Sequence, residues 1–417
     1  MQEVNGFAAL LSSSLDLQSA LHIMDYRSWL GSDVKRRGNF TLGLCLINKA
    51  TEEFSAMHGE FYGADIDSIS GLSHNLPELL TGIDGGYSFV LPVDDTLIFA
   101  RDQLGTKPLY YARDNTSFGV ASDVKVLRKF FSDVNVAEPG VLYKATQTSL
   151  TQISFNTLNY NIKPVQHNDA LHNISALLDE SVKRRIAGKR KIVLGFSGGI
   201  DSVILYILAS KHAKVEAVTV CVKDSVDYKL CESVADRLGI DLKMMVMDEK
   251  LIKDTIKKLH NMTQFDGAMH ASIACVVYVL AKFARSEGAD ALMLGQLADE
   301  LFGGYARYLK YLKSSAEKVS NTMFDDVKNA HIDNFCRDEM ASSPFTKLLL
   351  PYASLDLVKY VVNLPVDLKL NIKTGARKII LREVAKNLGI DDELANREKR
   401  AMQFSSGIYK IVSNLGL

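Results

Sequence analysis

A glycine-rich turn is the part of this sequence whose residue types best suit the binding of an anion. The stretch Lys191 to Ser202 reads KIVLGFSGGIDS, an apolar strand pattern that leads into a predicted helix from Ser202 to Ala213. Its glycines allow backbone N–H groups to approach a phosphate closely, and the positive end of the helix dipole adds attraction. The predicted phosphate-binding residues are Ser197, Gly198, Gly199, Asp201 and Ser202. Glycines alone would also suit a tight turn, and the spacing does not match the kinase-type GxxxxGK[ST] loop.

A second segment combines acidic residues with glycines after another apolar run. It reads LMLGQLADELFGGY from Leu292 to Tyr305 and contains Gly295, Gln296 and Asp299. Two carboxylates from different strand ends, Asp201 and Asp299, can hold Mg²⁺ against a phosphate leaving group, because hard cations prefer oxygen ligands. The alternative is a solvated helix start at Asp299 and Glu300, since acidic residues favour that end of a helix.

A third segment, near the end of the sequence, is rich in cations. It comprises GARKIILR from Gly375 to Arg382 and KRAMQFSSG from Lys399 to Gly407. Dense positive charge suits the binding of phosphates. The alternative is an exposed basic helix face, because Lys378 and Arg382 are four residues apart.

The elements that must position these segments fall into two patterns. Up to about Asn161 the sequence has short β-like runs broken by Gly, Asp and Asn, such as Tyr87 to Leu91 and Thr96 to Ala100. From His167 onward, amphipathic helices such as Ala170 to Arg185 alternate with apolar strand runs, which predicts a doubly wound parallel sheet. These strand runs are Lys191 to Phe196, Val215 to Val222, Lys243 to Met247 and Asp290 to Leu294. We therefore predict two domains, residues 1–162 and 163–417.

The composition argues against several classes of function. Lys plus Arg and Asp plus Glu both total 49, so no net charge attracts the chain to nucleic acid or to a membrane surface. The five cysteines are scattered without a CxxC pair, which indicates reduced thiols. The sequence predicts no signal peptide and no apolar stretch of membrane-spanning length. We expect a cytoplasmic protein.

The three segments, in this order and spacing, resemble the synthetase domain of asparagine synthetases over most of His167 to Leu417. SGGIDS resembles the pyrophosphate loop of the N-type ATP pyrophosphatases, which implies a sheet of the adenine nucleotide alpha hydrolase type. The resemblance implies ATP and Mg²⁺ as cofactors, with adenine held by backbone groups of Val215 to Val222 around Thr219, and Gly295 beside the nucleotide. A carboxylate, aspartate by default, would attack the α-phosphorus, and Lys378 would stabilise the charge. Ammonia would then convert the acyl-adenylate to an amide, releasing AMP.

The N-terminal part resembles the glutaminase domain of the same family. The matching strings are DGGYSF from Asp84 to Phe89, FARDQLGTKPLYY from Phe99 to Tyr111 and FGVASDVK from Phe118 to Lys125. The resemblance implies an α+β N-terminal-nucleophile-like sandwich whose catalytic Cys follows the first Met, but Gln2 stands there. His58 replaces an Asn of the family's glutamine-holding string, and Cys45 lies in an apolar run typical of a buried core thiol. We expect no glutaminase activity.

The synthetase part also departs from the family in places that concern the substrate. The family signature GEGxDE has Gln296 in place of its first glutamate, which is thought to assist the ammonia step, and β-lactam-forming relatives have Tyr there. A glutamine can still orient a neutral amine, so Gln296, Asp299 and Lys378 are the predicted catalytic residues. The substrate-side stretch Leu350 to Ser354 also differs from the family pattern. Asp266, Ser272 and Gln403 are expected near the same cleft, but we assign them no role.

Three functions follow from these observations. The first is ammonia-dependent asparagine synthesis, and the second is adenylating ligation of another carboxylate and amine, as in β-lactam synthetase-like relatives. The third is a non-catalytic nucleotide-binding regulator, which the retained phosphate-binding residues disfavour. The expected partners are a small carboxylate and ammonia, without nucleic acid or membrane. A homodimer and a separate ammonia-supplying glutaminase both stay open.

Overall fold

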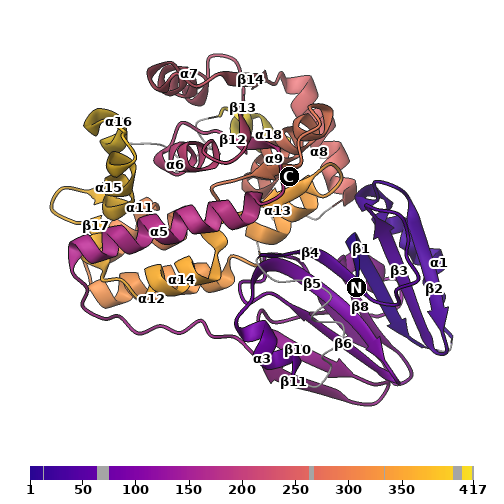
Figure 1. Ribbon diagram of the computed structural model, residues 1–417. Helices are drawn as coiled ribbons and strands as arrows, with labels where there is room; N and C mark the ends of the chain where they lie inside the picture. Colours follow the sequence, from indigo (N-terminus) through magenta and orange to yellow (C-terminus); the bar gives the residue numbers. More distant parts are fainter. Residues whose placement is uncertain (13, 63–74, 263–266, 333, 398–405, 416–417) are drawn as a thin grey trace. The chain divides into compact units, whose positions relative to one another are not determined.

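A β-rich unit and an α/β unit follow one another along the chain in the computed structural model, at Met1–Leu158 and Asn159–Leu417 (Figure 1). The structure describes residues 1–417 except residues 13, 63–74, 263–266, 333, 398–405 and 416–417. Each unit is described by itself.

Strands dominate the first unit, as the short β-like runs predicted. An eleven-stranded sheet has the order β11-β10-β6-β5-β4-β1-β8-β7-β9, with β3 pairing to β1 and β2 to β3. The strands are β1 (Gln2–Leu11), β2 (Ser32–Arg37), β3 (Phe40–Leu46), β4 (Ala56–Tyr62), β5 (Asp84–Val93), β6 (Thr96–Arg101), β7 (Tyr110–Arg113), β8 (Phe118–Ala121), β9 (Asn135–Val136), β10 (Val141–Ala145) and β11 (Leu150–Ser154). The short helices are α1 (Gln18–Leu21), η1 (His22–Arg27), α3 (Leu76–Thr81) and α4 (Val124–Leu127).

The two halves of this sheet face each other across a common apolar core. Phe99 of β6 stacks on Tyr143 of β10 with ring centroids 4.8 Å apart. It also lies 5.9 Å from Phe118 of β8, a strand to which β6 is not hydrogen-bonded. The outer faces are covered by helices, with α1, η1 and α4 on the β1 and β8 side and α3 on the β5 and β6 side. The layers are those of a β-sandwich between short helices.

The second unit alternates helices with buried strands, as predicted. Its elements up to β15 are α5 (His167–Ile186), β12 (Lys191–Gly195), α6 (Ile200–Ala209), β13 (Lys214–Cys221), α7 (Val226–Leu238), β14 (Leu242–Val246), α8 (Glu249–Met262), α9 (Gly267–Ser286) and β15 (Ala291–Met293). Those that follow are α10 (Ala298–Phe302), α11 (Ala306–Leu312), α12 (Ala316–Asn329), α13 (Asn334–Ser342), β16 (Lys347–Leu349), η2 (Pro351–Ala353), α14 (Leu355–Val362), η3 (Val366–Leu368), β17 (Leu370–Asn371), β18 (Ala376–Arg377), α15 (Ile379–Asn387), α16 (Asp392–Asn396) and α18 (Ile408–Ser413).

A five-stranded sheet in the order β14-β13-β12-β15-β16 forms the centre of the second unit, and every pairing in it is parallel. The chain leaves β12 toward β13 and β14, and then crosses back to β15 and β16. Right-handed crossovers therefore place α6 and α7 on one face and α9 on the other. The order reverses between β12 and β15, and parallel α/β sheets bind ligands at the carboxyl ends of the strands at such a point.

Helix α9 corrects one expectation from the sequence. Its 20 residues are long and apolar enough to cross a membrane by length and composition alone. However, α9 packs on β12, β13 and β15, and more than half of its residues are buried, from Ala271 to Ala284. Its apolar composition therefore serves the core of this unit, where a helix buried on most sides needs few polar residues.

Lys369 makes the stability of the second unit depend on pH. Its side chain is buried, and Nζ donates to the carbonyl oxygen of Val361, in the last turn of α14, at 2.5 Å. Burial lowers the pKa of Lys369 from its ordinary 10.5 to about 7. Between these two values the unfolded chain binds more protons than the folded chain. The contribution of Lys369 to the free energy of unfolding therefore rises with pH in that window.

We predict that a Lys369→Met variant lacks this rise. Between about pH 7 and pH 10, the wild-type free energy of unfolding should gain on the variant by up to about 1.4 kcal/mol per pH unit. Urea unfolding of both proteins across this range measures the difference. Lys373→Met, at an exposed turn, is the control. A wild-type minus Lys369→Met difference that stays constant with pH would contradict the prediction.

Candidate active site

A cavity of about 720 Å³ lies at the carboxyl ends of β12 and β15, within the range usual for small-ligand pockets. Nearly all of the predicted site residues line it. They are Ser197, Gly199, Asp201, Ser202, Thr219, Gly295, Gln296, Asp299 and Lys378. Gly198 belongs to the same turn but is absent from the lining. Its backbone has φ +64°, in the left-handed region that glycine adopts without strain.

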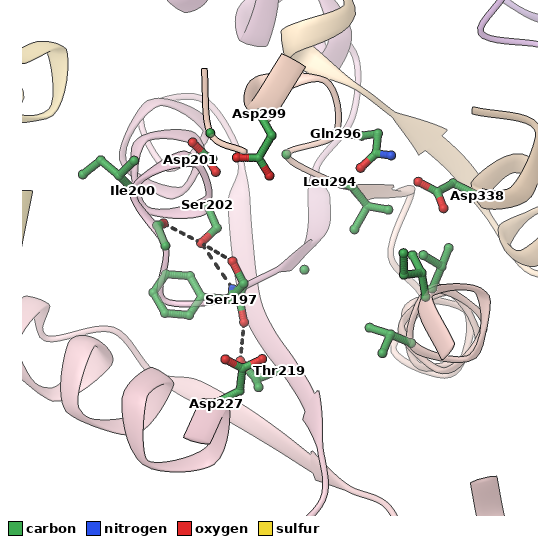
Figure 2. A pocket seen from close by; sticks show the side chains of 18 of the residues that line it. Ser197, Ile200, Asp201, Ser202, Thr219, Asp227, Leu294, Gln296, Asp299 and Asp338 are labelled. Atoms are coloured by element: carbon green, nitrogen blue, oxygen red, sulfur yellow. Dashed lines mark hydrogen bonds between the residues drawn. The ribbon is translucent and has the colours of Figure 1, made fainter. Parts of the chain in front are cut away.

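Hydrogen bonds of Ser202 hold the glycine-rich turn in shape. The Ser202 hydroxyl accepts from the backbone N–H of Ser197 at 3.2 Å and donates to the carbonyl oxygen of Gly199 at 2.9 Å. On the side toward β13, the Thr219 hydroxyl donates to the carbonyl oxygen of Phe196. Figure 2 shows these contacts below Asp201 and Asp299. The turn is therefore anchored at both ends beside the N-terminus of α6.

Three charged groups from distant parts of the chain meet at one end of the cavity. Lys378 Nζ lies 2.6 Å from Asp201 Oδ2 and 2.5 Å from Asp299 Oδ1. Burial opposes a charge on Lys378, but the two carboxylates outweigh it and raise the pKa of Lys378 above its ordinary value. Lys378 therefore carries a fixed positive charge at this point.

Tight backbone geometry supports this charge cluster. Lys378 is the residue before α15 and has φ +57°, a left-handed conformation that costs energy for a residue with a Cβ. Beneath the ion pairs lies Gly304. A Cβ at Gly304 would come 1.7 Å from Asp299 Oδ1 and 2.5 Å from Lys378 Cε. A side chain at position 304 would therefore have to displace Asp299 or Lys378.

The carboxylates of the cluster also fit a magnesium ion. Asp201 Oδ1 is buried and has no hydrogen-bond partner, although Oδ2 of the same group binds Lys378. Such an unpaired oxygen next to Asp299 is a ready ligand for a hard cation. Among the described residues, no group of three or more His, Cys, Asp or Glu side chains is arranged to hold a metal. The other ligands of an ion here would have to be water or phosphate oxygens.

The other end of the cavity is lined by uncharged and paired polar groups. Gln296 comes from the turn after β15, while Asn334, Arg337 and Asp338 come from one face of α13. Asn334 Nδ2 donates to Glu300 Oε1 at 2.9 Å, and the Tyr305 hydroxyl donates to the same oxygen at 2.7 Å. Burial, reinforced by the charge of Asp299, raises the pKa of Glu300 to about 7. Glu300 thus fixes the side chains of Asn334 and Tyr305, both of which line the cavity.

The structure limits two of the alternatives considered from sequence. Asp299 and Glu300 do lie in the first turn of α10, and the Asp299 side chain is 42% exposed, but Glu300 is buried and Asp299 binds Lys378, so this segment is more than a solvated helix start. Lys378 is also buried and precedes α15, so it does not belong to an exposed basic helix face. Arg382 lines the cavity and donates from Nε to the carbonyl oxygen of Arg377 at 2.7 Å.

The remaining substrate-side expectations have mixed outcomes. Leu350 to Ser354 is buried and absent from the lining, and the Tyr352 hydroxyl donates to the Asp201 carbonyl oxygen at 3.2 Å. That stretch therefore supports the charge cluster through Tyr352 and does not line the cavity. Ser272 donates to Met269 within α9 and does not line the cavity. Asp266, Gln403 and Lys399 to Ser405 lie outside the described residues. Ser406 is described, and its carbonyl oxygen accepts from Val222 N at 2.8 Å.

In the N-terminal unit, the side chain of Gln2 makes structural hydrogen bonds. Its side chain is buried, and Nε2 donates to the carbonyl oxygen of Lys49 at 3.0 Å. Its Oε1 accepts from the backbone N–H and hydroxyl of Thr51 at 3.1 and 3.2 Å. Cys45 is fully buried, and this burial raises the pKa of its thiol to about 12, which keeps the thiol protonated. His58 is buried as well.

Several lining residues were not predicted from the sequence. They are Asp227, Gly304, Tyr305, Asn334, Arg337, Asp338 and Arg377. A sequence signal existed for the α13 group, because the spacing of positions 334, 337 and 338 places three polar residues on one helix face. For Gly304 no local signal exists, since only the tertiary approach of Lys378 requires a glycine there.

Comparisons with known proteins point to one family. A family model described as asparagine synthase matches residues 173–343 and 312–411, and a glutamine amidotransferase domain model matches residues 47–129. A Methanocaldococcus jannaschii protein named “Putative asparagine synthetase (glutamine-hydrolyzing) 1” is 27% identical over 398 residues, covering 81% of this chain and 73% of that protein. Human asparagine synthetase (glutamine-hydrolyzing) is 24% identical over 369 residues, covering 79% of this chain and 64% of that protein. The pea nodule asparagine synthetase is 25% identical, with 84% and 63% covered. The match thus spans just under two thirds of the length of the plant and human relatives.

We predict that Gly304→Ala disables phosphate chemistry in this cavity. The new methyl group must displace Asp299 or Lys378, and a displacement of about 1 Å at a reacting site typically costs about 10²-fold in rate. ATP-dependent release of pyrophosphate is the measurement. Gly82→Ala is a matched control, because its methyl group comes no closer than 4.0 Å to the nearest atom. Full activity of Gly304→Ala would show that the ion cluster is dispensable.

Proposed function

Since this chain belongs to the asparagine synthase family, we propose that it is an ATP-dependent amide-forming ligase that works through an acyl-adenylate. The proposal rests above all on one observation, the meeting of Asp201, Asp299 and Lys378 beside a glycine-rich turn. This arrangement provides phosphate-directed N–H groups, two carboxylates and a fixed cation within one cavity. We further propose that residues 163–417 form the ATP pyrophosphatase domain, of the adenine nucleotide alpha hydrolase type.

The nucleotide would lie across the turn from Ser197 to Ser202. Backbone groups around Thr219 at the end of β13 would hold the adenine, and the N-terminus of α6 would face the phosphates. Mg²⁺ held by Asp201 and Asp299 would neutralise charge on the departing pyrophosphate. Lys378 would stabilise the charge that grows around the α-phosphorus. Gly295, which follows β15 and lines the cavity, would allow close approach of the nucleotide.

The carboxylate and the amine would occupy the end lined by Gln296 and α13. Aspartate is the default carboxylate and ammonia the default amine, giving asparagine, AMP and pyrophosphate. Gln296 would orient the neutral amine, since its side chain makes no hydrogen bond to any other described residue. A second candidate is a ligase for another carboxylate and amine, and it is favoured by Gln296 at the signature position. A non-catalytic regulator is disfavoured, because every predicted phosphate-binding residue except Gly198 lines one cavity.

We propose that residues 1–162 form a degenerate class II glutamine amidotransferase-like domain without glutaminase activity. The carboxamide of Gln2 cannot act as a nucleophile, and its hydrogen bonds to Lys49 and Thr51 give it a structural role. The buried thiol of Cys45 cannot replace the missing nucleophile. The amine would then come from solution or from a separate glutaminase protein.

The decisive experiment supplies ATP, Mg²⁺, aspartate and either ammonium or glutamine, and follows AMP, pyrophosphate and asparagine. We expect asparagine with ammonium and none with glutamine. Lys378→Met should lower pyrophosphate release by about 10²-fold or more, because a charge-stabilising group is removed. Lys373→Met is the matched control, since Lys373 is exposed and does not line the cavity.

Other outcomes would change the proposal. Pyrophosphate release only with another carboxylate would establish the second candidate. Glutamate formed from glutamine by the chain alone would contradict the loss of glutaminase activity. No nucleotide cleavage with any carboxylate would remove the ligase proposal.

A further inference from the structure

The amide-forming step needs a proton acceptor that the family signature no longer supplies in this chain. When ammonia attacks an acyl carbonyl, its nitrogen gains positive charge and must lose a proton before the amide is stable. A positioned base typically accelerates such a transfer by about 10² to 10⁴-fold. The signature position is Gln296, and a carboxamide cannot accept a proton at neutral pH.

Few side chains that line the cavity could act as the base of the amide-forming step. Its acidic side chains, within the part of the chain that the structure describes, are Asp201, Asp227, Asp299 and Asp338, and no described histidine lines it. Asp201 and Asp299 bind Lys378 at the phosphate end. Figure 2 shows Asp227 beside Thr219, below the glycine-rich turn, and shows Asp338 on the side of Gln296. Asp338 is therefore the carboxylate placed at the end where the amine must react.

The geometry of Asp338 suits a base that is already oriented. Arg337 Nε donates to Asp338 Oδ1 at 2.9 Å, and both side chains are almost completely buried. Asp338 Oδ2 makes no hydrogen bond to any other described residue, and the residue lines the cavity. One oxygen is thus fixed by the guanidinium, while the other remains available to a ligand.

The electrostatic surroundings leave Asp338 a stronger base than an exposed aspartate. Burial raises the pKa of Asp338 above its ordinary 3.8, and the charge of Arg337 partly opposes this shift. Glu339 on the same helix also raises it, and His270 of α9 acts in the opposite direction. A buried ion pair is costly to maintain, so its presence against a cavity also argues for a functional role.

We propose that Asp338 is the general base of the amide-forming step and that Gln296 only orients the amine. This inference rests on the proposed function. Ammonia attacks the acyl carbonyl, the C–N bond forms, and the cationic nitrogen transfers one proton to Asp338 Oδ2. The bond from the acyl carbon to the AMP oxygen then breaks, AMP leaves with that electron pair, and Asp338 returns its proton to solvent. The roles of one family glutamate are here divided between two side chains.

The test compares the two half-reactions in Asp338→Asn. The probe is aspartate, or whichever carboxylate supports pyrophosphate release in the wild-type chain. Carboxylate-dependent exchange of pyrophosphate into ATP reports adenylation, and asparagine formation from ammonium reports the second step. We expect exchange to stay within about twofold of wild type, while amide formation falls by about 10² to 10⁴-fold.

Two further variants separate a catalytic role from a structural one. Gln296→Glu restores a carboxylate at the signature position, so the double variant Gln296→Glu with Asp338→Asn should regain at least tenfold in amide formation. Glu339→Gln is the matched control, because Glu339 is a buried acid of the same helix that does not line the cavity. Hydroxylamine, which is mostly unprotonated at neutral pH, should still trap the acyl-adenylate of Asp338→Asn as a hydroxamate.

Each result has a defined consequence. Normal amide formation by Asp338→Asn overturns the proposal. An equal loss of exchange and amide formation, or an effect reproduced by Glu339→Gln, assigns Asp338 to carboxylate binding or to packing and also overturns it. Absence of rescue by Gln296→Glu rejects the division of roles. If the wild-type chain shows no exchange with any carboxylate, the proposed function itself fails, and this inference fails with it.

Discussion

The cost of burying charge is the constraint on which the second unit depends. Lys378 lies between Asp201 and Asp299. The charges of Lys378 and Asp201 are largely buried and would be expensive to bury unpaired, whereas the Asp299 side chain is 42% exposed. Their three chain segments therefore have to meet closely. Lys378 accordingly takes a left-handed backbone conformation, and a side chain at position 304 would have to displace Asp299 or Lys378. The strain is local, and it sits where the chemistry requires charge.

The parallel sheet makes this meeting possible. Because β12 and β15 are adjacent and run in the same direction, the turns after both strands emerge at one edge. The turn after β12 leads into α6, whose first residues include Asp201, and the turn after β15 leads into α10, whose first residues include Asp299. Lys378 comes from a segment more than seventy residues later. One side of the resulting cavity is strongly charged and suits phosphates. The other side pairs its charges within α13 and suits the smaller, less charged groups of an acyl transfer.

The elements and residues that a local sequence pattern specifies could be predicted from the sequence. Runs such as Lys191 to Phe196 were recognisable because a parallel strand buried on both faces is almost continuously apolar. Residues of the phosphate-binding turn were predicted because glycine and hydroxyl side chains have a direct chemical use there. The structure was needed for what depends on distant contacts, such as the glycine at 304 and the position of Lys378 outside its helix. Asp338 was missed because the sequence alone does not say which face of α13 borders a cavity.

The departures from the family pattern at Gln2 and at Gln296 are chemically related. Under the proposal that the N-terminal unit has no glutaminase activity, the amine must come from solution or from another protein, and amines in neutral solution are mostly protonated. A site that takes its amine from solution needs a group that accepts a proton at least as much as a site that receives free ammonia. Asp338, whose carboxylate is oriented by Arg337, is the group that we propose as this acceptor. Gln296 meanwhile adds no negative charge that would hold an ammonium ion in its unreactive form. Loss of the signature glutamate is therefore compatible with ligase chemistry, provided that the carboxylate of α13 is kept.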